Sequence, residues 1–411
     1  MHELLGVLLL LSLVWLHFRA VEKSFLKLYY FPALGLKLVA GVAVGLLYTY
    51  YYSGGDTWAY FNQAKLFADV GFASYSKFVN LFLKSNYELV DGFAYINQPR
   101  AALMVKLVAI INLLSNSSYW ITSLYFSFFS FIGIYKFSNW VAAKFEYGKI
   151  AALALFVWPS FIFWSSGILK EALAIGLIFW IIPTFFEMQK SMSVKKFIAI
   201  FLGLYFLFLI KYYFAMVLIV ILLLYSVSIA IKLDKKSPIQ QIALWLLMGV
   251  IGFAFGRLLH PNLRFENIIG VIIENNAAFL LKSNEVSSIH FLSANTEWVW
   301  VIINAPKAFF SSLFLPLNLF TKNFLQVTVA MENWVLLLLA VRGLLMVNKQ
   351  KLKSNYMLVI SAISYVVILA IFLALSTPNL GTLTRYKVAF IPVVIVLVTL
   401  ANRLRFEKEK Q

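Results

Sequence analysis

Apolar runs of membrane-spanning length alternate with short polar loops along most of the chain. A transmembrane helix needs roughly 20 apolar residues, within a range of about 17 to 25. The pattern predicts an all-α, polytopic transmembrane helix bundle of about 11–13 membrane segments, which forms a single integral membrane domain over 1–411. The apolar runs are 3–18, 32–52, 101–115, 119–135, 149–165, 168–187, 197–213, 214–231, 240–259, 302–320, 332–347, 355–375 and 388–402.

Lysine and arginine residues gather in the short loops between these runs. Loops that stay in the cytoplasm carry such an excess, so we expect the basic loops to be cytoplasmic. The two long polar stretches, 53–100 and 260–300, and the segment 376–387 then face outward. The residues that set this orientation are Arg19, Lys23, Lys27, Lys190, Lys195, Lys196, Lys232, Lys235, Lys236, Lys349, Lys351, Lys353, Arg403, Arg405, Lys408 and Lys410.

Strict alternation of spans does not satisfy this orientation everywhere. We therefore expect 101–115 and 302–320, which contain Lys106 and Lys307, to be re-entrant or to lie along the surface. Irregular backbone at membrane depth is tolerated only against protein or a watery cavity, so the two segments favour a cavity on the outer face. Within 53–100, the segments 56–70 and 75–83 mix apolar and polar residues, which is typical of interfacial helices.

Composition supports the membrane class. The chain is 62% hydrophobic and 13% charged, with a mean hydropathy of +0.85, whereas soluble domains are about a quarter charged. The net charge of +18 is explained by the cytoplasmic loops, so we expect no nucleic-acid partner. There is no cysteine, and the four histidines show no metal-ligand spacing. The apolar N-terminus, 4–18, lacks a cleavage site and is interpreted as a retained first helix.

The segment 48–60, Tyr-Thr-Tyr-Tyr-Tyr-Ser-Gly-Gly-Asp-Thr-Trp-Ala-Tyr, carries the first candidate chemistry. It follows an apolar run, and its tyrosines form an interfacial belt before a Gly-Gly turn. Asp56 is either the N-cap of a helix or a catalytic base at the membrane surface. Thr57 and Tyr60 are placed to orient it.

The segment 158–171 joins two apolar runs through a polar turn that ends in Lys170 and Glu171. A helix start explains part of it, because Ser165 or Ser166 can cap the helix and Glu171 suits the positive end of the helix dipole. Lys170 is unfavourable at that end, and a phosphate-bearing ligand would explain it. Both interpretations stay open.

Three further basic sites lie on the outer side. Arg385 and Lys387 in 376–387 lie on the outer side, whereas lysine and arginine usually gather in cytoplasmic loops. An arginine can bind phosphate or carboxylate with two hydrogen bonds. We therefore favour ligand binding there. Arg100 is a weaker case of the same kind. Lys211, with Tyr212 and Tyr213, is interpreted as an outer turn whose lysine extends to the interface. No nucleotide-binding or serine-hydrolase motif is present.

These features together resemble the GT-C superfamily of glycosyltransferases, which use polyprenyl-phosphate sugars. The branch of protein O-mannosyltransferases and aminoarabinose transferases is the most similar. Asp56 in Gly-Gly-Asp-Thr-Trp-Ala-Tyr matches that branch's first-loop acid, and Pro99-Arg100 resembles its re-entry into the membrane. Residues 158–171 are similar to its apolar, proline-led segment that ends in a base and an acid. The chain departs from the family where Lys170 directly precedes Glu171 and where the first loop has a single acid.

The resemblance implies transfer of a sugar from a polyprenyl-phosphate donor to an acceptor on the outer face of a membrane, the bacterial inner membrane in this case. Asp56 would act as general base, and Glu171 is a second catalytic candidate. The substrate-binding candidates are Lys170, Arg385, Arg100, Lys387 and Tyr60. No cofactor is implied with certainty, and a divalent metal stays open.

Two other classes of function remain open from the sequence. One is a polymerase of lipid-linked polysaccharide repeat units, which would use basic outer loops without an acid base. The other is a transporter or flippase, for which internal symmetry would be expected. Convergence of Asp56, Lys170 and Arg385 on one outward cavity would favour sugar transfer, whereas a charged pore through the bundle would favour transport.

Overall fold

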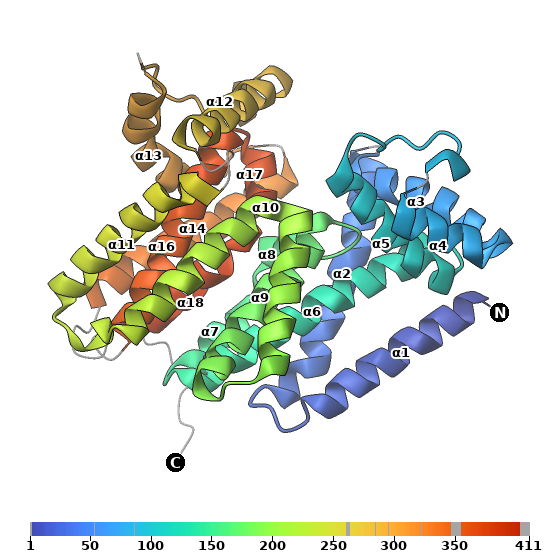
Figure 1. The fold of residues 1–411 in the computed structure, drawn as a ribbon, viewed down its shortest axis with the longest axis horizontal. Helices are drawn as coiled ribbons and strands as arrows, with labels where there is room; N and C mark the ends of the chain where they lie inside the picture. The colour runs from blue at the N-terminus through green and yellow to red at the C-terminus, as the bar shows by residue number, and fades with distance from the viewer. Residues whose placement is uncertain are drawn as a thin grey trace. The chain divides into compact units, whose positions relative to one another are not determined.

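The computed structural model describes residues 2–52, 54–85, 87–259, 264–283, 285–294, 296–321, 323–346 and 355–402. Helices make up the regular structure of these residues, and the β pairing among them is an isolated bridge between Ser288 and Asn379. The predicted all-α membrane bundle is confirmed (Figure 1). The basic segments 349–353 and 403–410, which we expected in the cytoplasm, lie outside the described residues.

Six helices in the described part of the chain are long and apolar enough to cross a membrane. Two bent helix pairs, Pro99–Ser115 with Tyr119–Lys144 and Leu380–Ala389 with Ile391–Ala401, raise this number to eight if each pair is one span. Two shorter apolar helices, Gly148–Val157 and Pro238–Gly252, are not counted. The sequence-based estimate of about 11–13 segments included runs of every length, so it exceeds this stricter number.

The chain divides into two compact units, Met1–Ala215 and Met216–Gln411, which are described separately. The boundary falls within α10 (Val194–Ala230), shortly after Lys211 interrupts the helix with φ −143° and ψ 76°. The other α-helices of the first unit are α1 (His2–Ala20), α2 (Tyr30–Leu46), α3 (Asp56–Ala73), α4 (Tyr75–Lys84), α5 (Pro99–Ser115), α6 (Tyr119–Lys144), α7 (Gly148–Val157), α8 (Pro159–Trp164) and α9 (Lys170–Lys190).

Helices α6 and α9 form the tightly packed centre of the first unit. A Cβ atom added to Gly133 of α6 would lie 1.9 Å from the carbonyl oxygen of Gly176 in α9. Only glycine permits so close an approach of two helix backbones, which is a common device in membrane proteins. This contact fixes α9, and with it Lys170, relative to α6.

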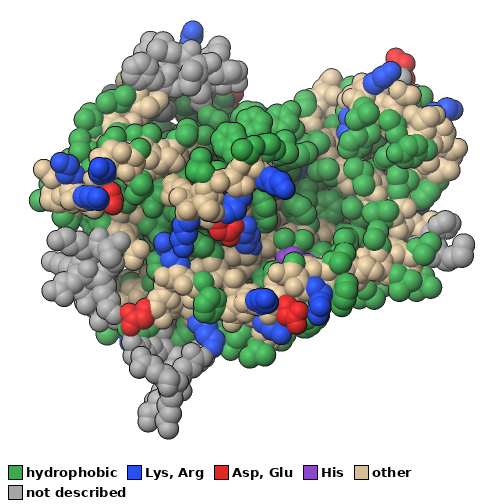
Figure 2. Space-filling model, turned by 60° about the horizontal axis from the view of Figure 1, so that its bottom comes forward, with side chains coloured by type: hydrophobic (Ala, Val, Ile, Leu, Met, Phe, Trp, Pro, Cys, Tyr) green, Lys and Arg blue, Asp and Glu red, His purple; other side chains and the backbone are tan. Residues whose placement is uncertain are grey.

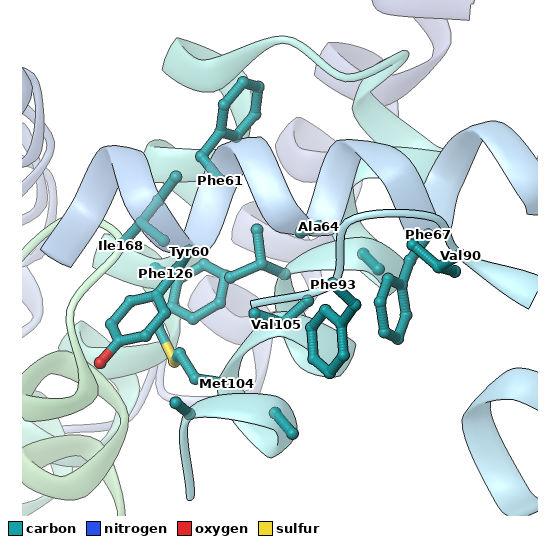
Figure 3. Close-up of a cluster of buried hydrophobic side chains, with 14 of the residues drawn as sticks. Tyr60, Phe61, Ala64, Phe67, Val90, Phe93, Met104, Val105, Phe126 and Ile168 are labelled. Atoms are coloured by element: carbon teal, nitrogen blue, oxygen red, sulfur yellow. The ribbon is translucent and has the colours of Figure 1, made fainter. Parts of the chain in front are cut away.

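Helices α3, α4 and α5 enclose a second apolar cluster in this unit (Figure 3). Phe67, Phe93 and Val105 are buried there. The axis of α5 turns by 117° into α6, which agrees with the expectation that 101–115 is re-entrant or lies along the surface. The segments 56–70 and 75–83, expected to be interfacial helices, form α3 and α4.

The basic loops of the first unit lie at one end of its helices. The hydroxyl groups of Ser24 and Tyr135 are 2.6 Å apart, and Lys136 Nζ is 3.3 Å from a carboxylate oxygen of Glu187. These contacts bring the α1–α2 loop beside the ends of α6 and α9. Lysine and arginine side chains gather on the face shown in Figure 2. The expected clustering of basic loops is therefore present within this unit.

The second unit contains the rest of α10, α11 (Pro238–Leu259), α12 (Phe265–Lys282), α13 (Glu297–Phe314), α14 (Phe324–Met346), α16 (Tyr356–Ser376), α17 (Leu380–Tyr386) and α18 (Ile391–Ala401). The Ile289 amide donates to the Pro378 carbonyl at 2.8 Å, and the Asn379 side chain donates to the Ser283 hydroxyl at 2.9 Å. Two segments that we expected on the outer side therefore meet within this unit. Helix α13 is not among the six candidate spans, in agreement with the expectation for 302–320.

Candidate functional site

A tight glycine turn presents Asp56 to solvent. Gly54 and Gly55 have φ angles of 129° and 111°, which side chains disfavour. A Cβ on Gly55 would also lie 2.9 Å from the Tyr48 ring. Gly55 occupies the N-cap position and Asp56 is the first residue of α3, so the N-cap interpretation of Asp56 was wrong. Its carboxylate is exposed in the first turn, where the helix dipole favours a negative charge.

The start of α3 is anchored by its next two residues. The buried Thr57 hydroxyl is 2.7 Å from the Tyr119 hydroxyl, and the Trp58 ring stacks on the Tyr119 ring with centroids 4.0 Å apart. The Trp58 indole nitrogen donates to the Thr49 hydroxyl at 2.9 Å. Thr57, expected to orient Asp56, thus joins α3 to α6. These contacts hold the Asp56 backbone at a fixed place between α2 and α6.

Tyr60 brings a cation and a second tyrosine near Asp56. It follows Asp56 by one helical turn, so the two residues lie on the same side of α3. Lys170 Nζ is 5.0 Å from the Tyr60 ring centroid, and the Tyr95 ring centroid is 5.7 Å away. Burial, followed by the nearby Asp56 carboxylate, raises the pKa of Tyr95. In Figure 3 the Tyr60 hydroxyl points away from Phe67 and Val90, out of the apolar cluster.

Glu171 forms a buried ion pair with Lys211. Lys211 Nζ lies 2.8 Å from Glu171 Oε1, and it also donates to the Tyr213 hydroxyl at 3.0 Å. Glu171 is fully buried and Lys211 is 7% exposed. The interpretation of Lys211 as a lysine that extends to the interface was therefore wrong. Its position within an apolar run was the available signal, because an ionisable residue at membrane depth needs a partner.

Arg100 completes this group of residues in the first unit. Its guanidinium group lies 4.5 Å from the ring centroid of Tyr212, the residue after Lys211, and Arg100 itself is exposed. A guanidinium stacked on an aromatic ring keeps its hydrogen-bond donors available at its edges. Five candidate residues of this unit are linked in the order Asp56, Tyr60, Lys170, Glu171 and Arg100. Asp56 and Tyr60 lie on one helix, Tyr60 contacts Lys170, and Lys170 precedes Glu171 in the chain. Glu171 is linked to Arg100 through Lys211 and Tyr212.

A buried lysine, missed in the sequence, holds the turn before Lys170. Lys37 Nζ donates to the Ser165 carbonyl at 2.6 Å, at the C-terminal end of α8 where a cation is favoured. The Ser166 hydroxyl donates to the Ile162 carbonyl at 2.6 Å, and the Gly167 amide donates to the Ser127 hydroxyl at 3.0 Å. The N-cap of α9 is Leu169, so the expectation that a serine caps this helix was wrong.

Arg385 and Lys387 belong to the second unit. Arg385, in α17, is partly exposed, whereas Lys387 is 2% exposed and donates to Asn333 Oδ1 at 2.7 Å. The Glu332 carboxylate is close enough to Lys387 to stabilise its charge. Lys387 therefore has an internal role in this unit. The convergence of Arg385 with Asp56 and Lys170 stays a prediction.

The residues of this site offer a carboxylate, two cations and aromatic rings. Within the described residues, no group of three or more histidine, cysteine, aspartate or glutamate side chains could hold a metal ion. The arrangement suits removal of a proton beside a bound anion. No protein-family model, curated protein or solved structure matches the chain.

Proposed function

We propose that this chain is a membrane glycosyltransferase of the GT-C type. It would transfer a sugar from a polyprenyl-phosphate donor to an acceptor hydroxyl on the outer face of the bacterial inner membrane. The observation that carries the proposal is the placement of Lys170 beside Tyr60, one helical turn from the exposed Asp56. A carboxylate one helical turn from a tyrosine that carries a cation suits a reaction that takes up a proton and releases a phosphate.

In the proposed reaction, the acceptor oxygen attacks the anomeric carbon of the donor sugar. Its proton passes to the Asp56 carboxylate, while the bond from the anomeric carbon to the phosphate oxygen breaks. The electron pair of that bond leaves with the polyprenyl phosphate, and the configuration at carbon inverts. Lys170 and Arg100 stabilise the negative charge on the leaving group.

Aromatic side chains supply the remaining features of a sugar site. The rings of Tyr60, Tyr95 and Tyr212 lie among the charged groups, and each offers an apolar face and a polar hydroxyl. The Tyr95 ring can pack against a sugar ring, while the cations bind the phosphate. This combination favours a donor that joins both chemical groups in one molecule.

The test is a comparison of lipids extracted from membranes that contain or lack the protein. A transferase should consume one polyprenyl-phosphate sugar and release the polyprenyl phosphate, so that lipid-linked sugar accumulates when the protein is absent. An Asp56→Asn strain should show the same accumulation as the deletion. Unchanged levels of every lipid-linked sugar in both strains would contradict the proposal.

A further inference from the structure

The ion pair between Glu171 and Lys211 lies behind the candidate site. Glu171 follows Lys170 in α9, and Lys211 precedes Tyr212, whose ring carries Arg100. Glu171 is therefore adjacent in the chain to one cation, Lys170, and Lys211 is adjacent to Tyr212, which contacts the other cation, Arg100. A shift of either member would move the cation on its own side of the site.

The backbone at Lys211 shows that the ion pair also defines where α10 is interrupted. With φ −143° and ψ 76°, Lys211 is extended, and helical residues precede and follow it. Its side chain lies against the rings of Tyr213 and Phe214, with centroids 5.6 Å and 5.8 Å from Nζ. A break in a helix at membrane depth requires new partners for the freed polar groups. The Glu171 carboxylate provides a fixed partner for the charge at this break.

We propose that the Glu171–Lys211 ion pair is a positioning element that fixes the separation of Lys170 and Arg100. The role of this spacing in substrate binding rests on the proposed function. The effect of the ion pair on the spacing itself can be tested without any substrate. In this account Glu171 is a positioning residue, because its buried carboxylate is bound by Lys211.

The experiment measures the distance between α3 and the helix that precedes Lys211. The chain has no cysteine, so spin labels can be attached at Asn62→Cys and Phe208→Cys, both exposed positions. The label at Asn62 in α3 follows the position of Tyr60, which contacts Lys170. The label at Phe208 follows the position of the helix segment that ends at Lys211. Pulsed electron paramagnetic resonance then gives the distribution of distances in the full-length protein.

The decisive variant replaces both members of the pair, Glu171→Met with Lys211→Met. Because no buried charge is left alone, this variant keeps a folded bundle more readily than either single change. We expect the distance distribution to broaden or shift, while Tyr213→Phe, which removes only the other partner of Lys211, leaves it as in the parent. A distribution in the double variant as narrow as in the parent would overturn the proposal.

A milder variant and a binding measurement complete the test. Glu171→Gln keeps the shape of the side chain and removes its charge, and it serves as the test if the double variant does not fold. The distance distribution should then broaden partially. An unchanged distribution would overturn the proposal. Binding of a short-chain polyprenyl phosphate should weaken tenfold or more in the variants that broaden the distribution. If the parent protein binds no polyprenyl phosphate, that result contradicts the proposed function. Broadening of the distance distribution in the variants would still support the positioning role.

Discussion

The Lys170 ammonium lies 5.0 Å from the centroid of the Tyr60 ring. Tyr60 follows Asp56 by one helical turn in α3. Tyr60 therefore contacts the cation of the candidate site and lies on the same side of α3 as Asp56. Its ring is buried against the α3–α5 cluster, so it is held in place by packing. A cation over the face of an aromatic ring is favoured, so the Tyr60 ring stabilises the charge of Lys170.

The electrostatic contact between Asp56 and Tyr95 gives a first prediction. A neighbouring negative charge disfavours the tyrosinate, so Asp56→Asn should lower the pKa of Tyr95. A fluorotyrosine placed at 95 reports this titration through its ¹⁹F shift. Asp69→Asn is the control, because Asp69 lies on the same helix about 20 Å away. An unchanged midpoint in Asp56→Asn would show that the two groups are not neighbours.

The same shift predicts a dependence of stability on pH. A pKa that is higher in the folded state means that the folded protein binds the proton more tightly. The contribution of Tyr95 to stability is then present below its unfolded pKa and is lost as pH rises through its folded pKa. Asp56→Asn should reduce this alkaline loss, which melting curves in detergent above about pH 10 can measure.

Lys387 and Arg385 should respond differently to mutation. Lys387→Met removes a positive charge near the buried Glu332 and the buried donor to Asn333, and leaving a buried polar group without its hydrogen bond costs about 1–3 kcal/mol. We expect a clear loss of thermal stability, which the additional change Glu332→Gln partly restores. Arg385→Gln should bind a polyprenyl phosphate less well. A Lys387→Met protein with the parent's melting curve would refute the internal role of this lysine.

The orientation in the membrane gives a prediction for each unit. Single cysteines at Asn97 and Ser293, both exposed, should react with an impermeant thiol reagent in intact cells. Met192→Cys, in the basic α9–α10 loop and 83% exposed, should react only after the cells are opened. The absence of cysteine in the chain removes any background. Labelling of Met192→Cys in intact cells, with protection of the other two, would reverse the orientation.

The sequence predicted the helical membrane class, the helices over 56–70 and 75–83 and the glycine turn before Asp56, because these depend on local composition and spacing. It also singled out Lys170 and Arg100, because both lie where an apolar run is interrupted by a charge. The roles of Lys37 and Lys211 could not be predicted in this way. Their partners, Ser165 and Glu171, are distant in the chain, and a linear pattern contains no information about which segments meet.

The end of α8 and the start of α9 show a second limit. Serine before a helix is a common N-cap, yet Ser166 bonds back to α8 and Leu169 takes the cap position. The Gly167 amide uses Ser127 of α6 as its acceptor. Tertiary contacts therefore replaced the local cap. The boundary between the two units falls within α10, shortly after its break at Lys211.

The central claim is that Asp56 is the general base. Asp56→Asn removes the proton acceptor without a steric change, and Asp56 is exposed rather than the N-cap, so folding should be unaffected. Asp56→Glu is the matched control, since it keeps a carboxylate displaced by one methylene and should retain a small part of the activity. Asp69→Asn, on the same helix, should be fully active.

The most direct measurement is the rate of sugar transfer from a purified lipid-linked donor in detergent, made for each variant beside its melting curve. The account predicts that Asp56→Asn melts like the parent, still binds the donor and transfers sugar about 10² to 10⁴ times more slowly. An Asp56→Asn protein that transfers sugar at the parent's rate would contradict the account.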